Sequence, residues 1–346
     1  MTVRLLTKPA SRTRKITTPL WQGLRRSLRI GLVNNMPDAA IAASERQFAE
    51  LLRRASHATG RSALPFHIER LHLPALPRGV PAREAMRYRY RNAADIAHLQ
   101  LDGIIFTGGV PNQADLRDEP YWRELTDAMN AAAALRLPTL YSCMAAHAAV
   151  LHFDQIRRRP LPQKLSGVYR VEARTRDGLL ARIEAPLLTP HSRYNGLDIH
   201  DLESGGYKVL TGSAEVGADA FINRTHGLTL FTHGHPEYEI DTLMLEYRRD
   251  LRRFLNHQRP DLPPYPANYF DPATRKGLDT LNKAALANPR PELLADFELV
   301  LQSAAPAPRW SGFATALYAG WLREVADYAS QSHPLAATPG PIKRLA

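Results

Sequence analysis

The chain alternates between short apolar runs and longer segments with helical spacing. Residues 28–33, 101–107 and 138–142 are largely apolar and lead directly into turn residues, which is typical of strands buried on both faces. Residues 41–56 and 119–136 place apolar side chains three and four positions apart, as on one face of a helix. This alternation predicts an α/β fold in which helices cover both faces of a parallel sheet.

The middle of the chain is richer in strands, and the last third is richer in helices. Further strands are predicted at residues 66–71, 167–173, 187–190, 207–211, 218–223 and 228–232. Helical segments are predicted at residues 145–151, 240–254, 275–303 and 310–328, and a basic, partly helical connection at 81–99.

Three regions follow from this pattern. Residues 1–27 are polar, basic and aperiodic, and we interpret them as an N-terminal arm. Residues 28–257 carry the alternation of strands and helices, and they are predicted to form the functional core. Five prolines between positions 260 and 272 mark a linker at the start of residues 258–346. We expect a helical extension and a loose tail in the remainder of that region.

Composition narrows the class of protein. Hydrophobic residues make up 44% of the 346 residues and charged residues 23%, which is ordinary for a soluble globular protein. No uncharged apolar run approaches the roughly 18–20 residues of a membrane helix, and the basic N-terminus lacks the apolar core of a secretory signal. We therefore expect a cytoplasmic protein, with a basic, acid-free presequence as the alternative.

The net charge of +11 has two interpretations. It can attract nucleic acid or small anionic ligands, or it can be a solvated surface of an arginine-rich protein. The arginines are spread along the chain and no nucleic-acid-binding motif accompanies them. The second interpretation is therefore favoured, and nucleic acid is not expected as a partner.

The single cysteine is the first candidate for chemistry. One cysteine excludes an intrachain disulfide and a zinc site built from several cysteines. Cys143 directly follows the apolar run 138–142 and precedes a stretch of helix formers. At such a turn, the N–H groups that begin the helix stabilise a thiolate and can hold an oxyanion. This position favours a nucleophile over an inert, buried thiol.

Two further motifs follow predicted strands. Residues 233–237 read His-Gly-His-Pro-Glu. A thiol nucleophile needs a base, and the base needs a partner that fixes its tautomer; His235 and Glu237 supply both. The two histidines alone make a poor metal site, so no metal is predicted. Residues 107–109 read Thr-Gly-Gly, where the glycines either supply an oxyanion donor or simply end the strand.

Together these residues resemble the homoserine O-acyltransferases, a family with the class I glutamine amidotransferase-like fold. The matching stretches are Asn34–Pro37 with Gln47 and Phe48, Asp102–Gly108, Tyr121-Trp122, Cys143 with Ala146–Leu151, Lys164–Tyr169, Pro190–Tyr194, Gly234–Tyr238, Asp241–Leu243, Arg249-Asp250 and Asn268–Phe270. They span about residues 28–270, with a further helix around 310–321. The resemblance implies a flavodoxin-like or amidotransferase-like parallel sheet with a C-terminal helical extension.

The resemblance also implies a reaction. An acyl group would pass from an acyl-CoA to Cys143 and then to the hydroxyl of L-homoserine, the first committed step of methionine biosynthesis. His235 would act as general base, oriented by Glu237. The oxyanion hole would comprise Gly108, Gly109 and Met144.

Substrate contacts are carried over in the same way. Residues matching Lys164, Ser192 and Arg249 contact the substrate in the family, and an amino-acid carboxylate suits an Arg fork or a Lys. Asn112 matches a position where Glu accompanies acetyl-CoA and Gly accompanies succinyl-CoA. Because Asn is uncharged and can donate a hydrogen bond, succinyl-CoA is the expected donor and acetyl-CoA the alternative. Either acts as a co-substrate, so no permanently bound cofactor is expected.

The sequence departs from the family at four places. Met144 stands where Trp is usual, and His147 stands where Gln is usual. Residues 38–43 are one residue longer than the usual loop, and residues 271–309 look inserted. These departures leave the acceptor open between homoserine, serine and another amino alcohol. The roles of the insertion and of the basic arm stay open, and a homodimer is implied by the family alone.

Two functions of other classes remain as alternatives. A glutamine amidotransferase or related cysteine hydrolase would use the same triad, but it usually has Gly after the nucleophile, where this chain has Met144. It would also serve a synthetase, which the sequence does not show. A basic nucleic-acid-binding module would have no use for all three triad residues.

Overall fold

The computed structural model describes residues 27–60, 63–175, 177–181, 183, 186–304, 306 and 309–332. The predicted N-terminal arm lies outside the described residues except for its last position, and the predicted loose tail is described only as far as residue 332. In the described part of the chain, ten strands form one sheet in the order β3-β2-β1-β4-β5-β10-β9-β8-β6-β7.

The strands are β1 (Leu28–Val33), β2 (Phe66–His72), β3 (Arg91–Asn92), β4 (Gly103–Phe106), β5 (Thr139–Ser142), β6 (Arg159–Ala173), β7 (Leu187–Gly196), β8 (Lys208–Ser213), β9 (Gly217–Asn223) and β10 (Thr229–Thr232). The helices are α1 (Ile41–Ala58), α2 (Val80–Met86), α3 (Trp122–Ala134), α4 (Met144–Asp154), α5 (Ile199–Ser204), α6 (Thr242–Leu255), α7 (Pro272–Ala287), α8 (Leu293–Gln302) and α9 (Ser311–Ser332).

The sheet has a parallel half and an antiparallel half. From β3 to β10 every neighbouring pair is parallel, and the order β2-β1-β4-β5-β10 is the doubly wound order of flavodoxin-like folds. From β10 to β7 every neighbouring pair is antiparallel. The predicted α/β fold with a parallel sheet flanked by helices is therefore confirmed.

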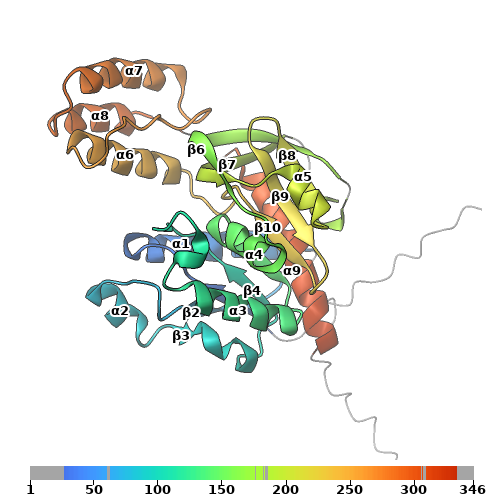
Figure 1. The fold of residues 1–346 in the computed structure, drawn as a ribbon. Coiled ribbons are helices and arrows are strands. Elements are labelled where there is room, and N and C mark those ends of the chain that lie inside the picture. Colours follow the sequence, from blue (N-terminus) through green and yellow to red (C-terminus); the bar gives the residue numbers. More distant parts are fainter. Residues whose placement is uncertain are drawn as a thin grey trace, which may run out of the picture.

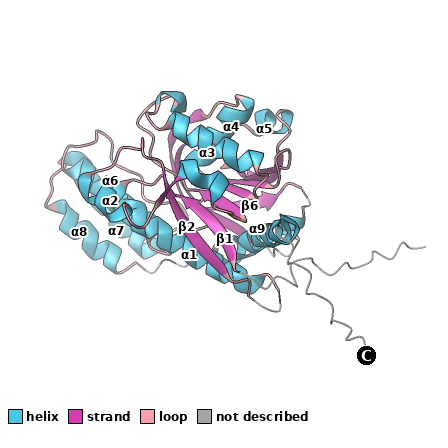
Figure 2. Cartoon of the chain, turned by 90° about the horizontal axis from the view of Figure 1, so that it is seen from below, coloured by secondary structure: helices cyan, strands magenta, loops and turns pink. Residues whose placement is uncertain are grey.

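Helices cover both faces of the sheet, as Figure 2 shows. The helices α3, α4 and α5 lie on one face, and α1 and α9 lie on the other. Each face has its own cluster of buried apolar side chains. The helices α6, α7 and α8 group together at one end of the molecule (Figure 1). Across the described residues, no helix is both long enough and apolar enough to span a bilayer.

The C-terminal helix α9 belongs to the layer that covers the sheet. Trp321, Leu322 and Val325 are completely buried. A Cβ atom placed on Gly103 would lie 2.8 Å from a methyl carbon of Val325, so the first residue of β4 has to be small for α9 to pack. The division of the chain into an arm, a core and an extension stays a prediction.

The structure differs from the predicted elements mainly beyond the parallel half. The strand β6 begins at Arg159, eight residues before the predicted strand, because its first half is polar and exposed and shows no apolar alternation. The helical stretch predicted at 275–303 is two helices, α7 and α8. Pro291, which has no N–H to donate, lies in the break between them.

The packing of α9 predicts a large loss of stability when one of its core side chains is removed. Leu322→Ala should lower the free energy of unfolding by about 2–5 kcal/mol, because it leaves a cavity against the sheet. Urea denaturation measures the change. Leu299→Ala is the matched control, since Leu299 on α8 is 67% exposed. Equal unfolding midpoints for the two variants would contradict the assigned role of α9.

Candidate active site

Cys143 lies on a sharp turn between β5 and α4. Its backbone has φ 48° and ψ −106°, a conformation that non-glycine residues rarely adopt and that is typical of strained functional positions. Its N–H donates to the carbonyl of Thr232 over 2.7 Å, which extends the pairing of β5 with β10 by one residue. The turn presents a partly exposed thiol at the N-terminus of α4.

His235 and Glu237 form a buried pair next to this thiol. Nδ1 of His235 lies 2.8 Å from Oε1 of Glu237, and His235 also hydrogen-bonds the side chain of Cys143. The hydroxyl of Ser142 donates to the same carboxylate oxygen over 3.4 Å. The structure thus brings the three predicted catalytic residues into one hydrogen-bonded chain.

The charges of Cys143 and Glu237 decide the protonation state of His235. Burial by itself lowers the pKa of His235, but the anionic forms of Cys143 and Glu237 together raise the pKa well above its ordinary value. Both partners also hydrogen-bond the ring, which further favours the protonated imidazole. A protonated His235 beside the sulfur is the arrangement of a thiolate–imidazolium pair.

Tyr238 packs on the face of the His235 ring, and the backbone of His235 is fixed by a hydrogen bond. The two rings stack with centroids 4.4 Å apart and planes 16° apart. The N–H of His235 donates to the carbonyl of Pro190 over 2.7 Å. Tyr238 in turn donates from its hydroxyl to Glu246 over 2.6 Å. The imidazole therefore has little freedom to rotate away from the thiol.

Both glycines after β4 lie at the site. A Cβ atom on Gly108 would lie 3.5 Å from Cβ of Cys143 and 3.8 Å from Cε1 of His235. A Cβ atom on Gly109 would lie 2.8 Å from Cε of Met144. The residues predicted to form the oxyanion hole, Gly108, Gly109 and Met144, are thus brought together beside the nucleophile. Their role as oxyanion donors stays a prediction.

Asn35, to which the sequence analysis gave no role, holds this glycine loop in place. Its N–H donates to Oγ1 of Thr107 over 2.8 Å, and its side-chain amide donates to the carbonyl of Thr107 over 3.0 Å. The carbonyl oxygen of Asn35 would lie 2.9 Å from a Cβ atom on Gly109. Two signals were present in the sequence: Asn35 follows a predicted strand of the parallel sheet, where ligand sites gather, and it lies in the stretch Asn34–Pro37 that resembles the family.

Lys164, Ser192 and Arg249 meet at two acidic side chains of α6. Nζ of Lys164 lies 3.0 Å from Asp250 and 3.5 Å from Glu246. The hydroxyl of Ser192 donates to Glu246. Nε of Arg249 donates to Asp250 over 2.9 Å, and the Arg249 side chain is half exposed. The three predicted substrate-binding residues are therefore neighbours.

Glu246 and Asp250, one helical turn apart, are the members of this cluster to which the sequence analysis gave no role. Burial raises the pKa of each carboxyl, but Lys164 and the hydrogen bonds that each accepts outweigh burial and lower it. Both are therefore ionised at neutral pH. Their spacing on an amphipathic helix could have placed them on one face, although it gave no sign that this face is buried.

Asn112, the residue predicted to select the acyl donor, is exposed on the loop after Gly109. Its backbone N–H donates to the buried carboxylate of Glu119, as does that of Gln113 over 2.7 Å. Arg158 holds the same loop through the carbonyl of Ala114 at 2.8 Å. The loop is thus fixed from inside, and the role of Asn112 stays a prediction.

Two more histidines are buried near the triad. The rings of His147 and His233 meet edge to face with centroids 4.9 Å apart. Burial lowers the pKa of His147 to about 3 and that of His233 well below its ordinary value, so both are neutral. Within the described ranges, no three His, Cys, Asp or Glu side chains are grouped to hold a metal ion.

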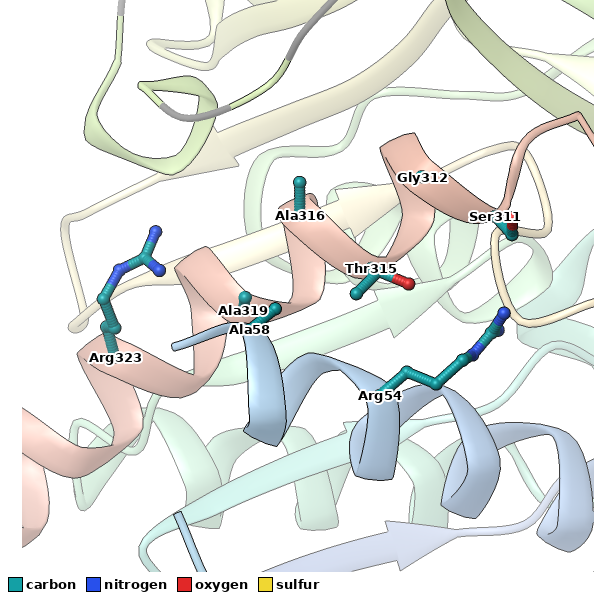
Figure 3. Close-up of a pocket in the computed structure, with 8 residues that line it drawn as sticks. All are labelled: Arg54, Ala58, Ser311, Gly312, Thr315, Ala316, Ala319 and Arg323. Atoms are coloured by element: carbon teal, nitrogen blue, oxygen red, sulfur yellow. The ribbon is translucent and has the colours of Figure 1, made fainter. Parts of the chain in front are cut away.

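Two hollows lie between α1 and α9, on the face of the sheet opposite to α3, α4 and α5. The first has a volume of about 380 Å³ (Figure 3) and is lined by Arg54, Ala58, Ser311, Gly312, Thr315, Ala316, Ala319 and Arg323. The second has a volume of about 390 Å³ and shares Arg54 and Ser311 with the first. It extends to Glu237 and Tyr238, so it reaches the triad from behind, whereas Cys143 lines neither hollow.

The sequence of this chain is similar to those of known enzymes. The family model described as homoserine O-succinyltransferase matches residues 21–331. A homoserine O-succinyltransferase from Rhodopseudomonas palustris is 40% identical over 322 residues, covering 92% of this chain and 94% of its own length. One from Methylorubrum extorquens is 39% identical over 304 residues, covering 88% and 89%. A solved glutamine amidotransferase from Methylobacillus flagellatus is 14% identical with TM-score 0.48, covering 86% of this chain and 94% of that one.

The close packing around Gly234 predicts that even one methyl group disturbs the triad. A Cβ atom there would overlap Oγ1 of Thr189 and lie 2.7 Å from Oδ1 of Asp219. Gly234→Ala should therefore cost about 1–3 kcal/mol of stability and displace the neighbouring His235. Urea denaturation measures the first effect. The rate at which iodoacetamide alkylates Cys143, the only cysteine, measures the second.

Gly312→Ala is the control for this variant. A Cβ atom on Gly312 would meet no atom within 4 Å, and Gly312 lies in the first turn of α9. Alanine there should leave the alkylation rate unchanged and the stability unchanged or slightly higher. If Gly234→Ala matched this control in both measurements, the close packing would have no bearing on the triad.

Proposed function

The chain belongs to the homoserine O-succinyltransferase family, and we propose that it transfers a succinyl group from succinyl-CoA to the hydroxyl of L-homoserine, the first step of methionine biosynthesis. The observation that carries the proposal is the hydrogen-bonded chain of Cys143, His235 and Glu237 at a strand-to-helix turn. The match of the family model to residues 21–331 gives this triad its context.

In the first half of the reaction, the sulfur of Cys143 attacks the thioester carbonyl of the acyl-CoA. The C–S bond to coenzyme A breaks and a new thioester forms on Cys143. His235, already protonated, gives its proton to the departing coenzyme A sulfur. Glu237 holds the imidazolium in position and balances its charge.

The tetrahedral intermediate carries a negative oxygen that needs hydrogen-bond donors. The N-terminus of α4 starts at Met144, and the loop of Gly108 and Gly109 lies beside it. We propose that backbone N–H groups of these residues hold the oxyanion. Donors fixed before the reaction stabilise the transition state without reorganising, and losing one typically costs about 10²–10³ in rate.

In the second half of the reaction, the hydroxyl of homoserine takes the acyl group. Neutral His235 removes the hydroxyl proton, the oxygen attacks the acyl carbonyl, and Cys143 leaves as the thiolate. We propose that Arg249, which is half exposed, binds the carboxylate of the acceptor, with Lys164 and Ser192 beside it. Tyr238 joins this group to His235, because it stacks on the imidazole and hydrogen-bonds Glu246.

We propose succinyl-CoA as the donor because the loop after Gly109 presents Asn112, which carries no charge to repel the succinyl carboxylate. Acetyl-CoA is the alternative that the first experiment below separates. The donor is consumed as a co-substrate, so no resident cofactor is needed. A free catalytic thiol suits a reducing compartment, and we place the reaction in the cytoplasm. A homodimer stays a prediction.

The proposed acyl-enzyme should be visible as a gain in mass. Wild-type protein mixed with succinyl-CoA should gain one succinyl group, and Cys143→Ala should gain none, because the variant lacks the chain's only thiol. Intact-protein mass spectrometry measures the gain. Acetyl-CoA in a parallel sample identifies the preferred donor.

The same labelled protein identifies the acceptor. L-homoserine should remove the acyl group and appear as its O-succinyl ester, whereas L-serine, as the matched acceptor one methylene shorter, should discharge it more slowly. If neither acyl-CoA labels the wild-type thiol, the acyltransferase proposal is excluded. Hydrolysis of L-glutamine by the same sample would then favour the amidotransferase alternative.

The raised pKa of His235 predicts how acylation depends on pH. The departing coenzyme A needs the proton of the imidazolium, which persists until the pH passes the raised pKa of His235 in the folded protein. The acylation rate constant should therefore hold through neutral pH and fall on the alkaline side. Single-turnover mixing followed by mass spectrometry measures it. A rate that instead rises with an apparent pKa of about 6.5, the ordinary value for histidine, would contradict the ion pair.

A further inference from the structure

The C-terminal helix α9 is joined to the loop that carries the catalytic residues. The indole N–H of Trp310, immediately before α9, donates to the carbonyl of Tyr238 over 3.1 Å. Trp310 and Ser311 also line the second hollow together with Glu237 and Tyr238. The beginning of α9 therefore lies against the back of the triad, although 72 positions separate Trp310 from Tyr238.

One carboxylate oxygen of Glu237 takes no part in the hydrogen bonds of the triad. Oε1 of Glu237 receives the hydrogen bonds from His235 and Ser142. Oε2 is buried, and no donor among the described residues reaches it. A buried carboxylate oxygen without a donor is costly, and the terminal torsion of a glutamate side chain is broad, so one anchored oxygen leaves the carboxylate plane free to turn.

A buried hydroxyl on α9 likewise lacks a hydrogen-bond partner among the described residues. Tyr318 lies seven residues after Ser311, its side chain is completely buried, and its hydroxyl has no hydrogen-bond partner in the part of the chain that the structure describes. Burial raises the pKa of Tyr318 well above its ordinary value, and the charge of Glu237 raises it further.

Trp310 fixes the start of α9 against the loop of Tyr238, and Val325 lies against Gly103 at the beginning of β4. Tyr318, between these two positions on the buried helix, therefore lies below the sheet toward the strand ends that carry the triad.

We propose that Tyr318 is a positioning residue for the triad, whose hydroxyl is joined to Oε2 of Glu237 through one bridging water. The second hydrogen bond fixes the plane of the carboxylate, and the carboxylate then fixes His235 against Cys143. Tyr318 touches no reacting atom. The inference rests on the triad role proposed for Glu237, and it is independent of the identity of the acyl donor and acceptor.

The pairing satisfies both groups at once. An ionised carboxylate accepts hydrogen bonds only, and a tyrosine hydroxyl can donate one, so a water that accepts from Tyr318 and donates to Glu237 supplies what each lacks. Hydrogen bonds to a charged group are stronger than those between neutral groups, more so away from water. The hydrogen bond from Trp310 to Tyr238 fixes the loop that carries Glu237 relative to the start of α9.

The variant that tests the proposal is Tyr318→Phe, which removes the hydroxyl and keeps the ring that fills the core. The acylation rate constant should fall by roughly tenfold, as expected when a hydrogen bond to a charged group is lost, while the half-saturating acyl-CoA concentration stays unchanged. Tyr328→Phe is the matched control on the same helix, because the hydroxyl of Tyr328 donates to the carbonyl of Leu135 instead. That variant should acylate at the wild-type rate.

A purely structural role gives a different result. If the hydroxyl of Tyr318 has no partner in solution either, its removal should raise the melting temperature and leave the acylation rate per folded molecule within twofold of wild type. That outcome would overturn the proposal. A slower rate at an unchanged half-saturating concentration, with the folded fraction equal to that of wild type by circular dichroism, would support it.

Alkylation of Cys143 by iodoacetamide separates this proposal from the proposed function. Alkylation needs the triad but no acyl-CoA, so it reports on Tyr318 even if no acyl donor labels the protein. Tyr318→Phe should alkylate several-fold more slowly than wild type at neutral pH, and Tyr328→Phe should not. Equal alkylation rates in all three proteins would exclude the positioning role whatever the substrate proves to be.

Discussion

The site depends on the parallel pairing of β5 with β10. This pairing places Ser142 opposite Thr232, so the two strands end side by side. The N–H of Cys143 then bonds the carbonyl of Thr232, and the chain of β5 turns into α4 while that of β10 runs on to His235. A shift of one residue in this register would turn alternate side chains to the other face and separate Cys143 from His235.

Much of the parallel half could be predicted from the sequence, because its strands are short apolar runs that end in turn residues. The triad could be predicted for the same reason, since Cys143 directly follows such a run and His235 comes three residues after the end of another. The cluster formed by Lys164, Ser192 and Arg249 with Glu246 and Asp250 was harder to predict. Lys164 lies on the polar part of β6, and Glu246 lies on a helix whose charged residues look like an ordinary solvated face. Their burial arises from contacts between distant segments, which no local pattern encodes.

One aromatic side chain joins the two halves of the site. Tyr238 stacks on the imidazole of His235 and hydrogen-bonds Glu246, which also binds Ser192 and lies 3.5 Å from Lys164. Glu246, whose carboxylate holds Ser192 and Lys164, is thereby linked through Tyr238 to His235. Since the burial of these charges is balanced within the cluster, removing one partner leaves the others uncompensated.

The position of α9 has a consequence for biosynthesis of the chain. All residues of the triad, and of the cluster around Glu246 and Asp250, have been synthesised once the chain reaches Asp250. The face of the sheet beside α1 nevertheless stays uncovered until Trp321, Leu322 and Val325 have been made. On the ribosome, this apolar surface therefore stays uncovered until α9 has emerged, at least 61 residues after Asp250. Until then the nascent chain exposes a surface that chaperones recognise.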